Sequence, residues 1–165
     1  MQLYIIRHAI AVYREEGGSI SDEARELTPD GARKMRRSAD GLRWLGLEPD
    51  EIWTSPLTRA VQTAEIVRAR LKVDSRVRSV DALRPGGDFD ALLRLLADSR
   101  LASVALVGHE PYLSEFTTSL LTGARISAVL FKKGGAACVE VEQFDPPVRG
   151  RLCWLLTPGQ MRRLG

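Results

Sequence analysis

Three short runs of the sequence are apolar enough to be strands buried on both faces: Leu3–Ile6, Glu51–Thr54 and Ser103–Val107. Helical patterns follow these runs, and their predicted starts are Thr28-Pro29, Pro56, Asp88 and Pro111. The first of these helices is expected to end at Gly46. The alternation predicts an α/β fold, a three-layer sandwich with a mainly parallel central sheet flanked by helices.

The C-terminal part has a different pattern. Ala137–Phe144 alternates apolar and acidic residues, and Arg151–Leu156 also has the composition of a strand. Pro146-Pro147 and Gly150 lie between them, which predicts a β-hairpin at an edge of the sheet. The 165 residues contain no internal repeat and no linker, so we predict a single domain over residues 1–165.

The charge pattern bears on possible partners. Lys and Arg number 24 against 21 Asp and Glu, and the basic residues are dispersed, which disfavours a nucleic-acid-binding face. No apolar run is long enough to span a membrane, and the N-terminus does not have the pattern of a signal peptide. We therefore expect a cytoplasmic monomer that binds neither nucleic acid nor membrane. Cys138 and Cys153 are expected to be reduced and packed, and Val12–Asp22 is expected to be a mobile loop.

The chain has two histidines, and each follows a predicted strand, in Ile6-Arg7-His8 and Val107-Gly108-His109. In open α/β sheets, ligands bind outside the carboxyl ends of the strands. A single histidine is often structural, and either of these could be. Two histidines at strand ends, one of them beside an arginine, predict a functional site.

Arg59 follows the remaining predicted strand, in Thr54-Ser55-Pro56-Leu57-Thr58-Arg59, at the opening of a helix. An arginine there can form two hydrogen bonds to a phosphate while the helix N-terminus adds positive charge. The alternative is a surface arginine that caps its own helix.

These motifs together resemble the histidine phosphatase (phosphoglycerate-mutase-like) superfamily. The matching segments occur in the family's order: Arg7-His8, Leu27–Gly31, Ser55–Ala60, Gln62–Ala64 and Gly108-His109. The short chain and the segment Leu83–Asp88 are most similar to the SixA-type phosphohistidine phosphatases.

The resemblance implies a metal-independent hydrolase without a cofactor. His8 would carry a transient phosphate, and Arg7, Arg59 and His109 would bind the phosphoryl group. The implied substrate is phosphohistidine on a histidine-phosphotransfer protein, and a small phosphorylated molecule remains the alternative. The arginine charges should keep His8 neutral, as a nucleophile must be.

The sequence departs from the family pattern at two positions. Ala9 stands where the family usually has glycine after the histidine, and Ala82 stands where many relatives carry a glutamate proton donor. Asp81 and Glu110 are then the possible proton donors. Because the nitrogen released from a phosphoramidate is readily protonated and leaves more easily than an alkoxide does, the missing acid favours P–N over P–O substrates.

Other classes of function are weighed against this one. A non-catalytic phosphate- or phosphoprotein-binding module would use the same pocket, and a phosphatase assay separates the two. A metal site on His8 and His109 is disfavoured because no cysteine or carboxylate accompanies them. A mutase is disfavoured by the short chain, and the P-loop motif is absent from the sequence.

Overall fold

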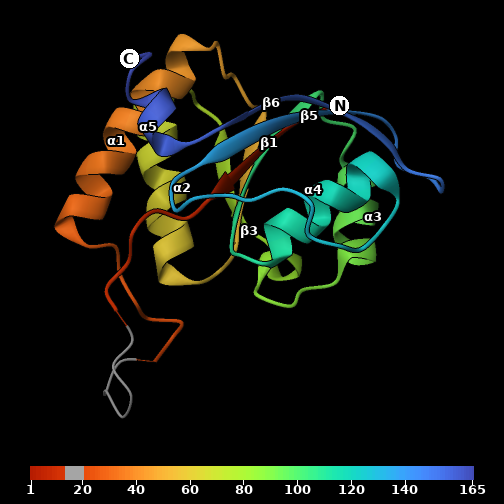
Figure 1. Cartoon of the computed structure of the whole chain (residues 1–165), viewed down its shortest axis with the longest axis horizontal. Coiled ribbons are helices and arrows are strands. Elements are labelled where there is room, and N and C mark those ends of the chain that lie inside the picture. The colour runs from red at the N-terminus through yellow and green to blue at the C-terminus, as the bar shows by residue number, and fades with distance from the viewer. Residues whose placement is uncertain (14–20) are drawn as a thin grey trace.

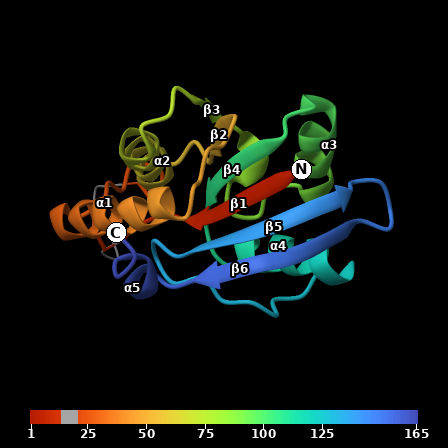
Figure 2. The same ribbon diagram turned by 90° about the horizontal axis from the view of Figure 1, so that it is seen from above.

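The computed structural model describes residues 1–13 and 21–165, within which six strands form one sheet (Figure 1). The strands are β1 (Gln2–Arg7), β2 (Glu51–Thr54), β3 (Arg76–Ser79), β4 (Ser103–Gly108), β5 (Ala136–Gln143) and β6 (Arg149–Leu156). Figure 2 shows their spatial order, β3-β2-β4-β1-β5-β6. The first four strands in this order are parallel to one another, whereas β5 is antiparallel to β1 and to β6. The mainly parallel sheet and the hairpin at its edge are confirmed.

Helices cover both faces of the sheet, which gives the three layers (Figure 1). They are α1 (Pro29–Trp44), α2 (Thr58–Leu71), α3 (Phe89–Ser99), α4 (Tyr112–Thr122) and α5 (Pro158–Met161), with a short 3₁₀ helix, η1, at Asp81–Leu83. The α1, α2 and α5 helices pack on one face, and α3 and α4 pack on the other. No helix in the described residues is both long and apolar enough to cross a membrane.

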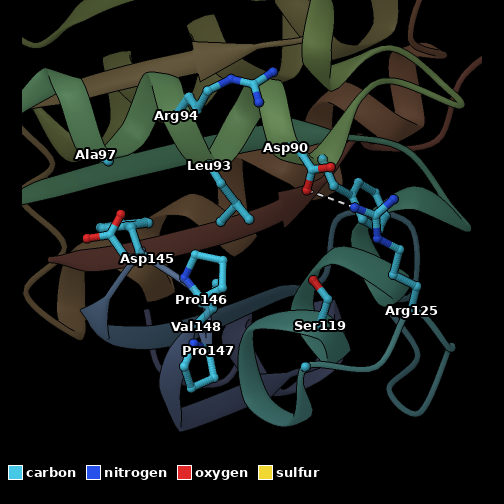
Figure 3. Close-up of a pocket in the computed structure, with 13 residues that line it drawn as sticks. Asp90, Leu93, Arg94, Ala97, Ser119, Arg125, Asp145, Pro146, Pro147 and Val148 are labelled. Carbon is cyan, nitrogen blue, oxygen red and sulfur yellow. Dashed lines mark hydrogen bonds and ion pairs between the residues drawn. The ribbon is translucent and has the colours of Figure 1, made fainter.

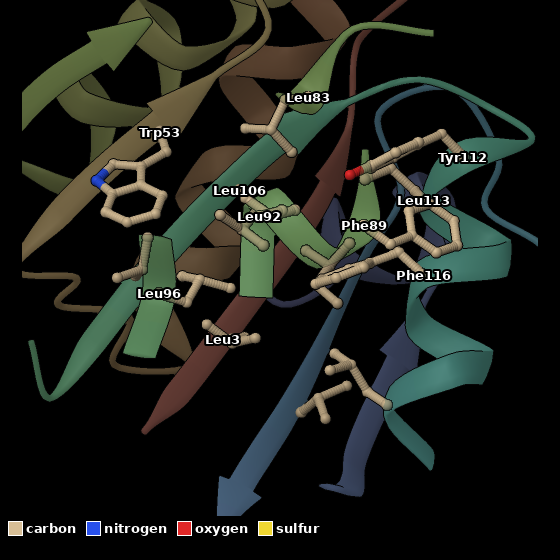
Figure 4. Packing of buried hydrophobic residues seen from close by; sticks show 14 of the residues in the cluster. Leu3, Trp53, Leu83, Phe89, Leu92, Leu96, Leu106, Tyr112, Leu113 and Phe116 are labelled. Atoms are coloured by element: carbon tan, nitrogen blue, oxygen red, sulfur yellow. The ribbon is translucent and has the colours of Figure 1, made fainter. Parts of the chain in front are cut away.

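β1 shows how one strand serves two cores. Its side chains alternate between the faces of the sheet, as the pleat requires. Leu3 and Ile5 enter the core under α3 and α4, and Tyr4 and Ile6 enter the core under α1 and α2. Figure 4 shows the first of these cores, in which the aromatic ring of Phe89 on α3 lies against side chains of α4. Burial on both faces explains why the run is continuously apolar.

The boundaries of α1 follow from local chemistry. The hydroxyl of Thr28 accepts a hydrogen bond from the Gly31 amide at 2.9 Å, which is an N-cap. At the other end, Gly46 has a φ of 75°, and its amide donates to the Arg43 carbonyl. This left-handed residue ends the helix as predicted, because glycine adopts that conformation without steric cost.

The sequence did not predict β3, η1 or α5. β3 is a four-residue edge strand with charged residues at alternate positions, so it carries no apolar run. α5 is held by a capping box between Thr157 and Gln160, and it buries Met161 against the α1 side.

Three smaller expectations have mixed outcomes. Gly150 lies within β6 and not in the turn, because the strand begins at Arg149. Both cysteines are free, but only Cys138 is buried, since Cys153 lies exposed on the edge strand. Most of the loop Val12–Asp22, namely residues 14–20, lies outside the described residues.

Candidate active site

The three predicted motifs emerge at one edge of the sheet. β1 and β4 are adjacent and parallel, with Arg7 beside Gly108 in register. The His8 amide donates to the Gly108 carbonyl at 3.0 Å, so His8 and His109 leave their strands side by side. β2 lies on the other side of β4, which places Ser55 next to the same point. The shared edge is the carboxyl end of the sheet, where such folds bind ligands.

The two histidines form the centre of the site. Both are buried, and their ring centroids are 5.1 Å apart. His8 Nδ1 lies 2.7 Å from the Ala9 carbonyl oxygen, which can only accept, so we assign the proton to Nδ1 and the lone pair to Nε2. His109 Nε2 lies 2.8 Å from the Ser55 hydroxyl oxygen. These contacts orient both rings.

Two arginines complete the group, which we call the phosphate pocket: Arg7, His8, Arg59 and His109. Arg7 Nη1 donates to the Phe131 carbonyl at 2.6 Å. Arg59 is buried at the start of α2, and its Nη1 and Nη2 donate to the Asp22 carbonyl oxygen at 2.6 Å and to Asp22 Oδ2 at 3.0 Å. Hydrogen bonds to oxygen atoms of the protein therefore fix the orientation of both guanidinium groups.

Three buried nitrogens of this pocket have no hydrogen-bond partner among the described residues: Arg7 Nε, Arg59 Nε and His109 Nδ1. Buried polar atoms are almost always paired, so unpaired ones indicate a site for a ligand. The two guanidinium nitrogens are charged donors, which suit the oxygens of a phosphoryl group.

Burial and charge keep both rings neutral. Burial is the main cause that lowers the pKa of His8 to about 4, and the charges of Arg59 and Arg7 lower it further. Burial likewise lowers the pKa of His109 to about 3, helped by His8 and Arg59. Near pH 7, His8 therefore has a free lone pair, as a nucleophile requires.

The two possible proton donors lie in different environments. Asp81 begins η1, and its carboxylate is exposed and pairs with Arg84 at 3.0 Å. Asp81 is therefore not one of the side chains of the phosphate pocket. Glu110 is half-buried directly after His109, and its Oε2 accepts from the Ser114 hydroxyl at 2.5 Å. Burial raises the pKa of Glu110, although the charge of Arg7 acts in the opposite direction. Of the two carboxyl groups, Glu110 lies closer to the pocket.

Asp22 is a residue of the site that sequence reasoning missed. Its carboxylate pairs with Arg59 and also with Arg25, at 2.7 Å for the Arg25 contact. Burial acts to raise the pKa of Asp22, but the hydrogen bonds from the two arginines lower it overall. No sequence pattern links Asp22 to Arg59, because the two are 37 positions apart and meet only in the folded chain.

Ser55 and Phe131 were not assigned roles from the sequence either. Ser55 belongs to the motif that identified Arg59, and its position directly after β2 is the signal that could have marked it. Phe131 contributes only a backbone carbonyl, which carries no side-chain signal.

A metal would need further ligands. Among the residues 1–13 and 21–165, no group of three or more His, Cys, Asp or Glu side chains is placed to hold a metal ion. His8 and His109 are thus a pair of imidazoles beside two arginines, a donor set that does not fit a metal.

A hollow of about 460 Å³ lies elsewhere, between α3, α4 and the turn after β5 (Figure 3). None of the pocket residues lines it. Its walls are formed by Leu93 on one side and Pro146 and Pro147 on the other, and an ion pair of 2.7 Å joins Asp90 to Arg125. Its lining includes neither of the two histidines, which lie at the carboxyl edge of the sheet instead.

Comparisons with known proteins agree with the geometry. The family model of the histidine phosphatase superfamily (branch 1) matches residues 3–87, just over half of the chain. An uncharacterized protein of Picosynechococcus sp. is 36% identical over 138 residues, which cover 82% of each chain. The phosphohistidine phosphatase SixA of Escherichia coli is 28% identical over 98% of this chain and 97% of its own.

The fold comparison is equally extensive. The structure of the protein histidine phosphatase SixA complexed with tungstate superimposes with a TM-score of 0.83. It is 29% identical, and the match covers 98% of this chain and 99% of that chain.

Proposed function

This chain belongs to the histidine phosphatase superfamily, and from that premise we propose that it hydrolyses phosphohistidine through a transient phosphate on His8. It is a phosphatase with the same overall fold as SixA. The observation that carries the finer proposal is the neutral, oriented imidazole of His8 beside two charged guanidinium groups with unpaired buried nitrogens.

In the first step, His8 Nε2 attacks the phosphorus of the substrate. The new P–N bond forms as the P–N bond to the substrate imidazole breaks. The leaving imidazole keeps a proton on its other ring nitrogen, so it departs as a neutral molecule. The Ala9 carbonyl, which accepts from His8 Nδ1, stabilises the positive ring that forms on the enzyme.

In the second step, water attacks the same phosphorus. Its oxygen bonds to phosphorus as the bond to His8 Nε2 breaks, which releases inorganic phosphate and a proton to solvent. In both steps negative charge spreads over the three equatorial oxygens of the phosphoryl group. Arg7, Arg59 and His109 stabilise that charge, and no metal ion takes part in the proposed mechanism.

The missing acid supports the choice of substrate. A phosphate ester releases an alkoxide, which needs a proton from a positioned acid, whereas neutral imidazole needs none. Ala82 lies on η1 and is partly buried against the core, with no carboxyl group of its own. The SixA similarity supports the same substrate, and the tungstate of the SixA structure is a tetrahedral oxyanion like phosphate. We propose a histidine-phosphotransfer protein as the carrier.

A second candidate is a phosphomonoesterase that acts on a small molecule. Glu110 is the observation in its favour, because a half-buried carboxyl group with a raised pKa can donate a proton. A non-catalytic binding module is the third. It has less support, because both histidines and both arginines are present and lie at one edge of the sheet.

A substrate panel tests the proposal. We expect kcat/KM for a phosphohistidine peptide and for phosphoramidate to exceed that for sugar phosphates by about a hundredfold or more, the usual value of a positioned acid to ester cleavage. Chelation with EDTA should leave these rates unchanged. Ala82→Glu should raise the ester rate more than the phosphoramidate rate, and Asp81→Asn is the matched control on the same short helix.

A native preference for sugar phosphates that Glu110→Gln abolishes would establish the second candidate instead. Loss of activity in EDTA, restored by a divalent ion, would contradict the metal-free mechanism.

A further inference from the structure

Two strongly exposed hydrophobic side chains lie on the segment that leads into the phosphate pocket. Four large hydrophobic residues of the described chain are more than half exposed: Tyr13 at 90%, Trp44 at 76%, Leu130 at 72% and Ile126 at 58%. Ile126 and Leu130 lie on the segment between α4 and β5, in which Phe131, directly after Leu130, contacts Arg7. Exposed apolar side chains that cluster at one place indicate an interaction site.

The segment before β5 is joined to the pocket by its backbone. We call residues 125–133 the rim segment, which forms neither helix nor strand. The Phe131 carbonyl accepts from Arg7, and the Gly134 amide, directly after the segment, donates to the carbonyls of both Arg7 and His8. Leu130 is therefore one residue away from a direct contact with the pocket.

Resting on the function proposed above, we propose that the rim segment is the docking surface for a folded protein that carries the phosphohistidine. A free phosphoramidate or a sugar phosphate has no apolar surface for Leu130 and Ile126 to contact. A protein that presents a phosphorylated side chain to a buried histidine must lay its own surface around the pocket. The exposed apolar side chains would then be covered only in the complex.

Charge identifies the chemistry of that partner. The rim segment contains Arg125, Lys132 and Lys133 and no acidic residue. Arg125 pairs with Asp90, whereas the two lysines are exposed and form no ion pair within the part of the chain that the structure describes. The positive charge of Lys133 also acts on the pKa of His8, which places it near the pocket. An acidic surface around the phosphohistidine is complementary to this rim.

A second hollow next to the rim segment offers a place where one side chain of the partner binds. It has a volume of about 310 Å³ and lies between Gly86-Gly87, the start of α4 at Pro111 and Tyr112, and Arg125. Phe89 and Arg125 line both this hollow and the one in Figure 3. Interfaces commonly seat one large side chain in such a pocket. The hollow shares Arg125 with the rim segment, so one partner surface can cover both.

The experiment compares a protein substrate with a small one. The probes are an isolated histidine-phosphotransfer domain, phosphorylated on histidine with phosphoramidate, and phosphoramidate itself. We expect the double variant Leu130→Ser, Ile126→Ser to raise KM for the protein about tenfold, as truncation of interface anchors does, and to leave kcat/KM for phosphoramidate unchanged. With Leu130→Met in place of Leu130→Ser, KM for the protein should return most of the way to the wild-type value, since methionine keeps an apolar side chain at this position.

Trp44→Ser is the matched control, because Trp44 is equally exposed but lies at the C-terminal end of α1. Trp44→Ser should change neither KM for the protein nor kcat/KM for phosphoramidate. Equal losses on both substrates would overturn the docking proposal, since they would indicate a disturbed pocket, and unchanged KM for the protein would overturn it as well. If the wild-type enzyme hydrolyses neither P–N compound, it is the proposed function that fails. Circular dichroism and thermal unfolding confirm that each variant is folded.

Discussion

The phosphate pocket and the rim segment lie side by side but are built in opposite ways. The pocket side chains stand at strand ends and at the start of a helix, and three of the four, His8, Arg59 and His109, are buried. The rim side chains are mostly exposed and belong to no helix or strand. The pocket is therefore held by the sheet, whereas the rim can change in sequence without moving a strand. The difference suggests that the pocket determines the reaction and the rim determines which molecule delivers the phosphate.

The largest expected effect is the loss of the nucleophile. His8→Ala should lower turnover by at least about a thousandfold on the protein substrate and on phosphoramidate alike, because the covalent step is removed for both. A pocket residue thus affects both substrates, unlike the rim variants above. Steady-state assays with both substrates measure it.

Chemical trapping identifies the site of the phosphate. Wild-type enzyme mixed with labelled substrate and quenched rapidly should carry an acid-labile, base-stable label on His8, and His8→Ala should carry none. A label on His109, or full turnover by His8→Ala, would assign the nucleophile elsewhere.

A smaller effect is expected at Arg59. Arg59→Lys keeps the positive charge but loses the planar guanidinium group. In Arg59 the two Nη atoms of that group bond to Asp22, and Nε, unpaired among the described residues, is left to bind the phosphate. We therefore expect kcat to fall about a hundredfold. Arg68→Lys is the control on the same helix, since the side chain of Arg68 is half-exposed and, among the residues that the structure describes, pairs with Glu65 alone. Parallel kinetics of the two variants measure the difference, and equal behaviour would show that the site needs only a positive charge at this position and not the planar guanidinium group.

The smallest effect concerns pH. The pKa of His8 is about 4 and that of His109 about 3, so kcat/KM for phosphoramidate should show no ionisation of either ring between pH 6 and 8. It should fall as the pH approaches 4, where His8 takes up a proton. A limb in the kcat/KM profile with a midpoint near 6.5 would contradict the neutral nucleophile.

The same shifts bear on stability. An unfolded histidine binds its proton near pH 6.5, whereas the folded rings do so only near 4 and 3. Between these values the unfolded state holds more protons, so stability is full above pH 6.5 and is lost as the pH falls toward 4. At about 1.4 kcal/mol per pKa unit, the full loss is on the order of 3 kcal/mol for His8 and 5 kcal/mol for His109. Unfolding by urea at pH 7.5 and 5 should show the loss, and a smaller loss in His8→Ala.

Local patterns predicted much of this molecule. The run Leu3–Ile6 predicted a strand buried on both faces, and Thr28-Pro29 with Gly46 predicted both ends of α1, since caps depend on a few neighbouring residues. Edge strand β3 was missed because its alternating arginines have no apolar period. The short α5 helix was missed although it has a capping box, because its four residues are too few to show a helical period.

A buried strand followed by a polar residue is a local pattern, so the sequence already indicates which side chains stand at strand ends. That β1 lies beside β4, and that the two imidazole centroids are therefore 5.1 Å apart, follows from the folded chain alone. The folded chain also decides that Asp22 holds Arg59 and that the Phe131 carbonyl holds Arg7. Such contacts join residues far apart in the chain, and they depend on the order of strands in the sheet, which no local pattern encodes.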